Sequence, residues 1–413
     1  MRSRTQAGRS IDRVTRNDYA AAMRVLFSST RGTGHLLPLL PYAKALVAKG
    51  HEVLVAGPGE LREPVLGAGL THAPFAHPGD ESLAPFWARL RSVPAEEQAA
   101  IFIREIFAGA NSRAAYPGLL ETIRTWKPQL IVRDSVEFAA LVAAEASGVP
   151  HVRVAVHQWP MEQNVCALAA APIDMLREIA GLAADDGASL RGEPIFTAFP
   201  ESFEGPMPNG SWRVHRVAPA VAAPPTAGAG FQPDGDGLPL VYVTFGTIAS
   251  TLPEGKVLYD TALEAIAQLP VRALLTTGRG FDVAALGVLP TNVRVEAWVP
   301  QAEVLHHAAA LVCHGGAGTV LGGLAAGVPQ VVVPIGADQP FNAQSVASLG
   351  AGLALPKPNT ETLRSAIQRL LDEPEFRRSA RAVAAEMAAL PSMDTTVNTL
   401  LQIASLKTSR SAL

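Results

Sequence analysis

The sequence predicts an α/β protein with two domains, each built on a mostly parallel sheet. The chain has 413 residues, more than a single hydrophobic core usually serves. Apolar strand-like runs alternate with helical stretches in both halves, which is the pattern of parallel strands joined by crossover helices. A segment rich in Pro, Gly and Ala separates the two halves and offers no periodic face to bury.

The first half contains two strand–helix–strand units. In the first unit, an apolar strand from residue 25 leads into a Gly-rich turn, a helix over 37–49 and a strand over 51–56. The second unit has a strand over 130–132, a helix through 138–144 and a strand over 151–156. We therefore expect a doubly wound parallel sheet in this half.

The same alternation restarts after the Pro-rich segment. Strands are predicted over 240–245, 273–276, 293–296, 311–313 and 330–334, and residues 395–406 form a helix that the pattern does not place. We expect two Rossmann-like domains facing a cleft. The predicted boundaries are an N-terminal extension over 1–22, a domain over 23–217, a linker over 218–238 and a domain over 239–413.

Composition narrows the class of partner. Hydrophobic residues make up 48% and charged residues 17% of the chain, and the net charge is -3. A dedicated nucleic-acid binder needs a concentrated basic face, which this sequence lacks, so we expect a small-molecule partner. Cys166 and Cys313 lack the spacing of a zinc site or disulfide framework. With no apolar run of membrane-spanning length, the expected location is the cytoplasm, as monomer or homodimer.

A glycine-rich turn in the second half has the form of an anion site. A buried strand runs into His314, then Gly316, Gly318 and Thr319, where a helix opens. Unpaired N–H groups and the helix dipole at such a start favour a diphosphate. The turn alone is equally compatible with glycines that only let the helix pack on its sheet.

Residues flanking this turn supply the other parts of a nucleotide-sugar site. Trp298 and Val299 lie upstream, where the indole offers a surface for stacking on a nucleobase. Asp338 and Gln339 follow the next strand, and their carboxylate and amide suit sugar hydroxyls. Base, phosphate and sugar therefore each have predicted contacts.

These motifs together resemble the nucleotide-sugar glycosyltransferases of the antibiotic and plant natural-product superfamily, which have the two-domain GT-B fold. The resemblance covers nearly the whole chain after Met23 and is most specific over 298–339. It implies Trp298 on the base, His314, Gly318 and Thr319 around the diphosphate, and Asp338 with Gln339 on the sugar. Phe245-Gly246-Thr247 also resembles the turn of the family, which implies that Thr247 lies near the phosphates.

The first half offers a general base for sugar transfer. His35 lies at the mouth of the first helix, and histidine titrates in the range that proton removal from an attacking hydroxyl requires. Asp134 follows a strand on the same sheet edge and would orient the imidazole, the dyad that the family resemblance also implies. A helix-capping role remains open for each residue.

One position departs from the plant members of the family. They carry a glutamate eight residues after the histidine to hold the ribose hydroxyls, whereas this chain has Gly322. A deoxyribose has no 2'-hydroxyl and therefore loses least when that glutamate is absent. We expect thymidine diphosphate sugars to be favoured over uridine diphosphate sugars. The expected reaction is an inverting single displacement onto an apolar natural-product acceptor, with no cofactor and no metal.

Three other functions share some of these sequence features. A dinucleotide oxidoreductase is disfavoured because Leu37 and Leu321 stand where the third glycine of its motif belongs. A sugar-nucleotide epimerase of the same fold and a non-catalytic nucleotide-sugar-binding protein remain alternatives. Aromatic residues of the first half suit either an acceptor pocket or the core: Phe86, Trp87, Phe102, Phe107 and Trp159.

Overall fold

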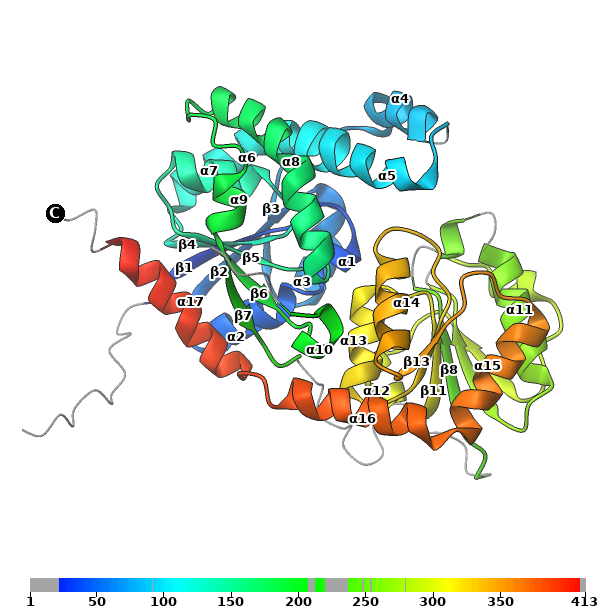
Figure 1. Ribbon diagram of the computed structural model, residues 1–413. Helices are drawn as coiled ribbons and strands as arrows, with labels where there is room; N and C mark the ends of the chain where they lie inside the picture. Colours follow the sequence, from blue (N-terminus) through cyan, green and yellow to red (C-terminus); the bar gives the residue numbers. More distant parts are fainter. Residues whose placement is uncertain are drawn as a thin grey trace, which may run out of the picture.

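A computed structural model shows two α/β lobes side by side (Figure 1). It describes residues 22–90, 92–206, 212–219, 237–246, 249–252, 255–278 and 280–408. The predicted extension over 1–22, except its last residue, and most of the predicted linker lie outside these ranges. The predicted fold class, two mostly parallel sheets flanked by helices, is confirmed.

The first lobe contains a seven-stranded sheet of order β3-β2-β1-β4-β5-β6-β7, in which every neighbouring pair is parallel. Parallel strands are buried on both faces, which is why they read as continuous apolar runs in the sequence. The strands are β1 (Arg24–Ser28), β2 (Glu52–Gly57), β3 (Thr71–Pro74), β4 (Leu130–Asp134), β5 (His151–Val154), β6 (Pro194–Thr197) and β7 (Arg213–Arg216).

Helices cover both faces of this sheet. The predicted helix over 37–49 is split in two and begins earlier, because Leu37 donates its backbone N–H to Thr33 within the Gly-rich turn. The helices are α1 (Thr33–Leu36), α2 (Leu40–Ala48), η1 (Gly59–Leu61), α3 (Arg62–Gly67), α4 (Asp80–Leu90), α5 (Ala95–Ile101), the π-helical η2 (Phe102–Asn111), α6 (Ser112–Trp126), α7 (Ala139–Ala146), α8 (Trp159–Ile179), α9 (Ala188–Gly192) and α10 (Glu201–Glu204).

The second lobe contains a six-stranded parallel sheet of order β10-β9-β8-β11-β12-β13. Its strands are β8 (Leu240–Thr244), β9 (Arg272–Thr276), β10 (Val293–Glu296), β11 (Ala308–Cys313), β12 (Gln330–Val332) and β13 (Gly352–Ala354). Its helices are η3 (Ala249–Thr251), α11 (Gly255–Ala267), η4 (Val283–Leu286), α12 (Gln301–Leu305), α13 (Ala317–Ala325), α14 (Gln339–Ser348), α15 (Thr360–Asp372) and α16 (Pro374–Ala388).

The last helix, α17 (Met393–Thr408), crosses back to the first lobe (Figure 1). Its apolar residues Val397, Leu400 and Leu401 are buried in the same core cluster as Val25 and Leu46. Helix α17, which the prediction assigned to the second domain, thus contributes side chains to the core of the first lobe. Helical spacing reveals an apolar face, but it does not identify the sheet against which that face packs.

Within the described ranges, no helix combines the length and apolar character needed to cross a bilayer.

Candidate functional site

The predicted site residues gather where the strand order of each sheet reverses. The reversal lies between β1 and β4 in the first sheet and between β8 and β11 in the second. Open α/β sheets leave a crevice outside the carboxyl ends of the strands at such a point. His35 follows β1 and Asp134 ends β4, whereas His314 follows β11. Thr247, after β8, lies outside the described residues.

His35 and Asp134 form an imidazole–carboxylate pair. Nδ1 of His35 lies 3.4 Å from Oδ1 of Asp134, within ion-pair distance when the imidazole is protonated, and the geometry is not that of a well-aligned hydrogen bond. Asp134 is fully buried and accepts backbone N–H groups from Thr30 at 2.8 Å and Val136 at 2.9 Å. Burial alone would raise the pKa of Asp134, but His35 and these two donors outweigh it and lower the pKa. The carboxylate is ionised and its position is fixed.

A series of aromatic rings leads from α4 to His35. Ring centroids are 5.5 Å apart between Trp87 and Phe102, 6.2 Å between Phe102 and Phe107, and 5.7 Å between Phe107 and His35. All three aromatic residues are half-buried. Trp159 is buried against Trp212 in the core instead. The first three rings are therefore placed to form an apolar wall beside the imidazole.

His314 is enclosed by two glycines. A Cβ on Gly246 would lie 2.7 Å from Cε1 of His314, and a Cβ on Gly316 would lie 2.5 Å from Nε2. Gly246 also has φ +68°, which favours glycine. Burial lowers the pKa of His314 to about 4 against the opposing charge of Asp338, so the imidazole is neutral at pH 7. Within the described part of the chain, Nδ1 has no hydrogen-bond partner.

Helix α13 begins directly beside this histidine. Gly316 is its N-cap, and no side chain caps the helix. The space where a Cβ of Gly318 would stand is open, and Thr319 is partly exposed in the same turn. A glycine-lined helix start of this kind accommodates a phosphate close to its backbone N–H groups.

The residues predicted for the base and the sugar occupy the surrounding loops. Trp298 is 54% exposed, and Val299 beside it is half-buried. Asp338 is half-buried, and its Oδ2 accepts from Asn342 Nδ2 at 2.9 Å. Oε1 of the buried Gln339 accepts the backbone N–H groups of residues 335 and 336 at 2.7 and 3.0 Å. Gln339 therefore holds this loop in place, which leaves only its Nε2 for a sugar.

Sequence reasoning missed the residues that join the two lobes. Gln158, after β5, donates to Oδ1 of Asn342 at 3.3 Å and accepts from Ser345 at 3.1 Å. Asn342 in turn donates to Asp338 and, at 2.9 Å, to the carbonyl of Gly315. The position of Gln158 just beyond the carboxyl end of a strand could have marked it as a site residue from the sequence. No sequence pattern, however, indicates that it meets Asn342 on a distant helix.

Gly322 faces Gln301, a residue to which the sequence motifs assign no role. A Cβ at Gly322 would lie 2.3 Å from Nε2 of Gln301, which donates to the carbonyl of Gly318 at 3.3 Å. The Gln301 side chain thus occupies the space that a longer residue at 322 would enter. A substitution there has to displace a flexible side chain, not backbone.

Comparison with known proteins gives two family models that match the chain. The erythromycin biosynthesis protein CIII-like N-terminal domain matches residues 44–163, and the corresponding C-terminal domain matches residues 262–403. Each match falls within one of the two lobes, except that the second continues into α17.

Individual proteins match over nearly their whole length. Elloramycin glycosyltransferase ElmGT of Streptomyces olivaceus is 34% identical, over 89% of this chain and 94% of that protein. The crystal structure of glycosyltransferase SnogD from Streptomyces nogalater has a TM-score of 0.74 and 30% identity, covering 93% of this chain and all of that one. Glycosyltransferase VinC, solved in complex with dTDP, has a TM-score of 0.73 and 27% identity, with the same coverage.

Proposed function

Since the chain belongs to the erythromycin biosynthesis protein CIII-like family of natural-product glycosyltransferases, we propose that it transfers a hexose from a thymidine diphosphate sugar to a hydroxyl of a small apolar acceptor. One observation carries this proposal. The His35–Asp134 pair and the helix start beside His314 lie at the reversal points of two sheets that Gln158 and Asn342 join. A base and an anion site then face the same crevice.

Each group has a defined part in the proposed reaction. His35 removes the proton from the acceptor hydroxyl as that oxygen attacks the anomeric carbon, and Asp134 stabilises the imidazolium that forms. The diphosphate leaves with the electron pair of the broken bond, held by the α13 N–H groups, Thr319 and the neutral imidazole of His314. A single displacement of this kind inverts the anomeric carbon.

Two observations support the choice of an apolar acceptor and of a thymidine nucleotide. The rings of Trp87, Phe102 and Phe107 lead to His35, which favours an acceptor with an apolar face. Gly322 offers no side chain to a ribose 2'-hydroxyl, and VinC binds dTDP in its crystal structure. The donor sugar is further proposed to be a deoxyhexose, because one relative is a desosaminyl transferase.

A nucleotide-release assay tests the proposed function. Purified protein is incubated with thymidine diphosphate sugars and a panel of hydroxylated polycyclic and macrolactone acceptors, and release of thymidine diphosphate is followed with mass analysis of products. We expect acceptor-dependent release and a glycosylated product. Binding without turnover on every acceptor would favour a non-catalytic binding protein, and a donor converted to its epimer without an acceptor would favour an epimerase.

A further inference from the structure

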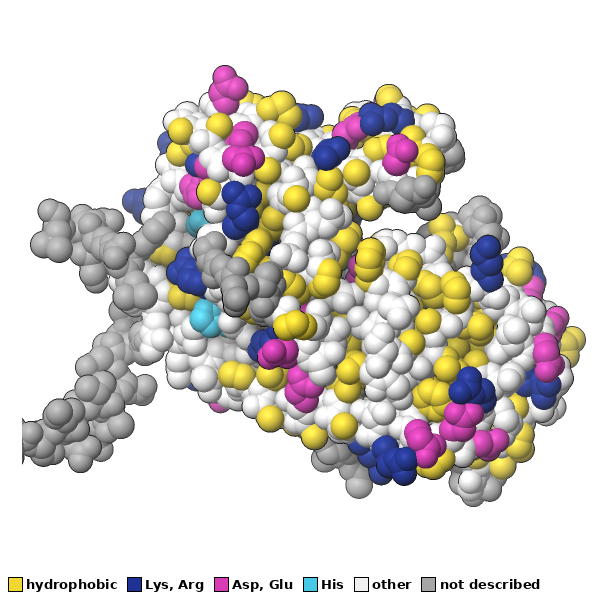
Figure 2. All heavy atoms as spheres, in the orientation of Figure 1, with side chains coloured by type: hydrophobic (Ala, Val, Ile, Leu, Met, Phe, Trp, Pro, Cys, Tyr) yellow, Lys and Arg dark blue, Asp and Glu magenta, His cyan; other side chains and the backbone are white. Residues whose placement is uncertain are grey.

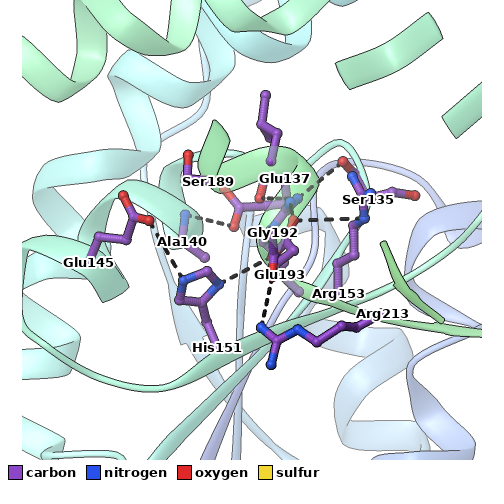
Figure 3. Close-up of polar contacts among 12 residues, drawn as sticks. Ser135, Glu137, Ala140, Glu145, His151, Arg153, Ser189, Gly192, Glu193 and Arg213 are labelled. Atoms are coloured by element: carbon purple, nitrogen blue, oxygen red, sulfur yellow. Dashed lines mark hydrogen bonds and ion pairs between the residues drawn. The ribbon is translucent and has the colours of Figure 1, made fainter. Parts of the chain in front are cut away.

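Strand β5 carries a histidine–glutamate pair near each of its ends. At the amino end, Nδ1 of His151 lies 3.2 Å from Oε2 of Glu193, with Glu145 on the other side of the ring (Figure 3). Beyond the carboxyl end, Nδ1 of His157 lies 3.4 Å from Oε1 of Glu162. Ligands bind outside the carboxyl ends of parallel strands, so only the second pair lies on the site edge of the sheet.

A buried carboxylate lies beside one nitrogen of the His157 ring. Glu162 is fully buried on α8, and its other oxygen lies 3.7 Å from Nη1 of Arg153. Nδ1 of His157 is buried and makes no hydrogen bond of good geometry within the described residues, so its proximity to Glu162 is an ion-pair contact. The side chain remains 14% exposed, so the exposed part lies elsewhere on that side chain. Because Nδ1 lies beside Glu162, Nε2 lies on the far side of the ring.

The surroundings of His157 place it opposite the donor half. The next residue, Gln158, is hydrogen-bonded to Asn342 and Ser345 of α14, the helix that starts immediately after Asp338. Burial opposes the charged form, but Glu162, Asp338 and Asp134 together raise the pKa of His157. The negative charges of Asp338, predicted for the sugar, and of Asp134, in the predicted base pair, therefore both favour the protonated imidazole.

The two lobes leave open space between them on one side of the molecule. In the space-filling view, open space separates the part of the first lobe that carries α4 and α5 from the second lobe (Figure 2). The reacting sugar of a transferase has to lie between the base of one lobe and the phosphate site of the other. The β5–α8 loop meets the second lobe through Gln158, so this loop belongs to the part of the first lobe that borders the donor half.

We propose that His157, positioned by Glu162, donates a hydrogen bond from Nε2 to the hexose of the donor, opposite Asp338. His157 is then a sugar-recognition residue supplied by the lobe that carries the base. The inference rests on the proposed function, because it requires a nucleotide-sugar donor. The proposed contact should lower the Kd of the nucleotide sugar and leave the Kd of the nucleotide alone unchanged.

The test compares the Kd of thymidine diphosphate with that of thymidine diphosphate glucose, by calorimetry, in wild type and variants. In His157→Asn, the shorter amide retains contact with Glu162 and loses reach, so the ratio Kd(nucleotide)/Kd(nucleotide sugar) should fall about tenfold, or about 1.4 kcal/mol. In His157→Gln, the amide reaches the Nε2 position and should recover part of the ratio. Glu162→Gln should lower the ratio less than His157→Asn.

The matched control is His151→Asn, which alters the other histidine–glutamate pair of the same strand. This variant should leave the ratio unchanged, whatever it does to the Tm. An unchanged ratio in His157→Asn overturns the inference, as does an equal weakening of both ligands. If wild type binds neither thymidine ligand, the thymidine donor of the proposed function is wrong, and the same ratio measured with uridine diphosphate and uridine diphosphate glucose decides the role of His157.

Discussion

The two histidines at the reversal points follow different strands of their sheets and differ in their environments: His35 comes after β1, whereas His314 comes after β11, the counterpart of β4. The side chain of His35 is 20% exposed beside the ionised Asp134, whereas His314 is 8% exposed between two glycines and its pKa falls to about 4. An imidazole beside a carboxylate is suited to accept a proton, and a neutral buried imidazole is suited to donate a hydrogen bond. The groups that surround each ring therefore decide which of the two roles its histidine can take.

Removing the first histidine should have the largest effect. His35→Ala should lower turnover about a hundredfold or more, because general-base catalysis contributes about that much. Binding of thymidine diphosphate should survive, since the phosphate site lies in the other lobe. Steady-state nucleotide release and calorimetry measure the two effects, and near wild-type turnover would rule out His35 as the base.

Displacing the second histidine should weaken donor binding. In Gly316→Ala the new Cβ would meet Nε2 of His314 at 2.5 Å, so the ring has to move. Losing one hydrogen bond to a charged group costs about 1.5–3 kcal/mol, or about 10- to 100-fold in the Kd of thymidine diphosphate. Gly67→Ala is the control, because its Cβ would meet open space. Equal donor affinity in both variants would contradict the placement of His314 at the diphosphate.

Acidification should destabilise the protein through His314. Its pKa is about 6.5 unfolded and about 4 folded, so the unfolded state binds more protons between these values and stability falls as pH falls through this range. The loss by pH 5 is on the order of 2 kcal/mol. Burial raises the pKa of Glu137 to about 7, which acts in the opposite direction.

The comparison of wild type with His314→Asn isolates the histidine from Glu137. Urea unfolding at pH 7 and pH 5 should show a smaller loss on acidification in the variant than in wild type. Identical pH dependence in the two proteins would mean that His314 has an ordinary pKa in the folded state.

The preference for one nucleotide over the other should be a smaller effect than those above. Thymidine diphosphate sugars should be favoured about tenfold over uridine diphosphate sugars, since Gly322 provides no ribose partner. Gly322→Glu should shift selectivity toward uridine, and Gln301→Ala should enlarge that shift by clearing the space that Gln301 occupies. Measured kcat/KM for the same sugar on both nucleotides decides this. A uridine preference that Gly322→Glu leaves unaltered would transfer the choice to base contacts.

Chelation should have the smallest effect. The leaving diphosphate is proposed to be neutralised by the α13 start, Thr319 and His314, so exhaustive treatment with EDTA should leave turnover unchanged. A loss of activity that magnesium or manganese restores would show that the second lobe needs a cation in addition to its helix start.

Local sequence was sufficient to predict the parts of the site that follow strands. His35, Asp134 and His314 all stand just beyond apolar runs, and the carboxyl ends of parallel strands meet at one sheet edge. The comparisons confirm the predicted resemblance to natural-product glycosyltransferases. The assignment of individual residues to donor and acceptor remains a prediction.

Other features depended on contacts that no spacing rule reveals. The sequence by itself determined the alternating elements, the strand ends and the glycines of the phosphate turn, because these follow from local periodicity and backbone freedom. Only the tertiary structure decided that α17 returns to the first sheet and that Gln158 meets Asn342. The physical reason is that burial and charge neighbours depend on which surfaces meet, and those surfaces are assembled from segments far apart in the chain.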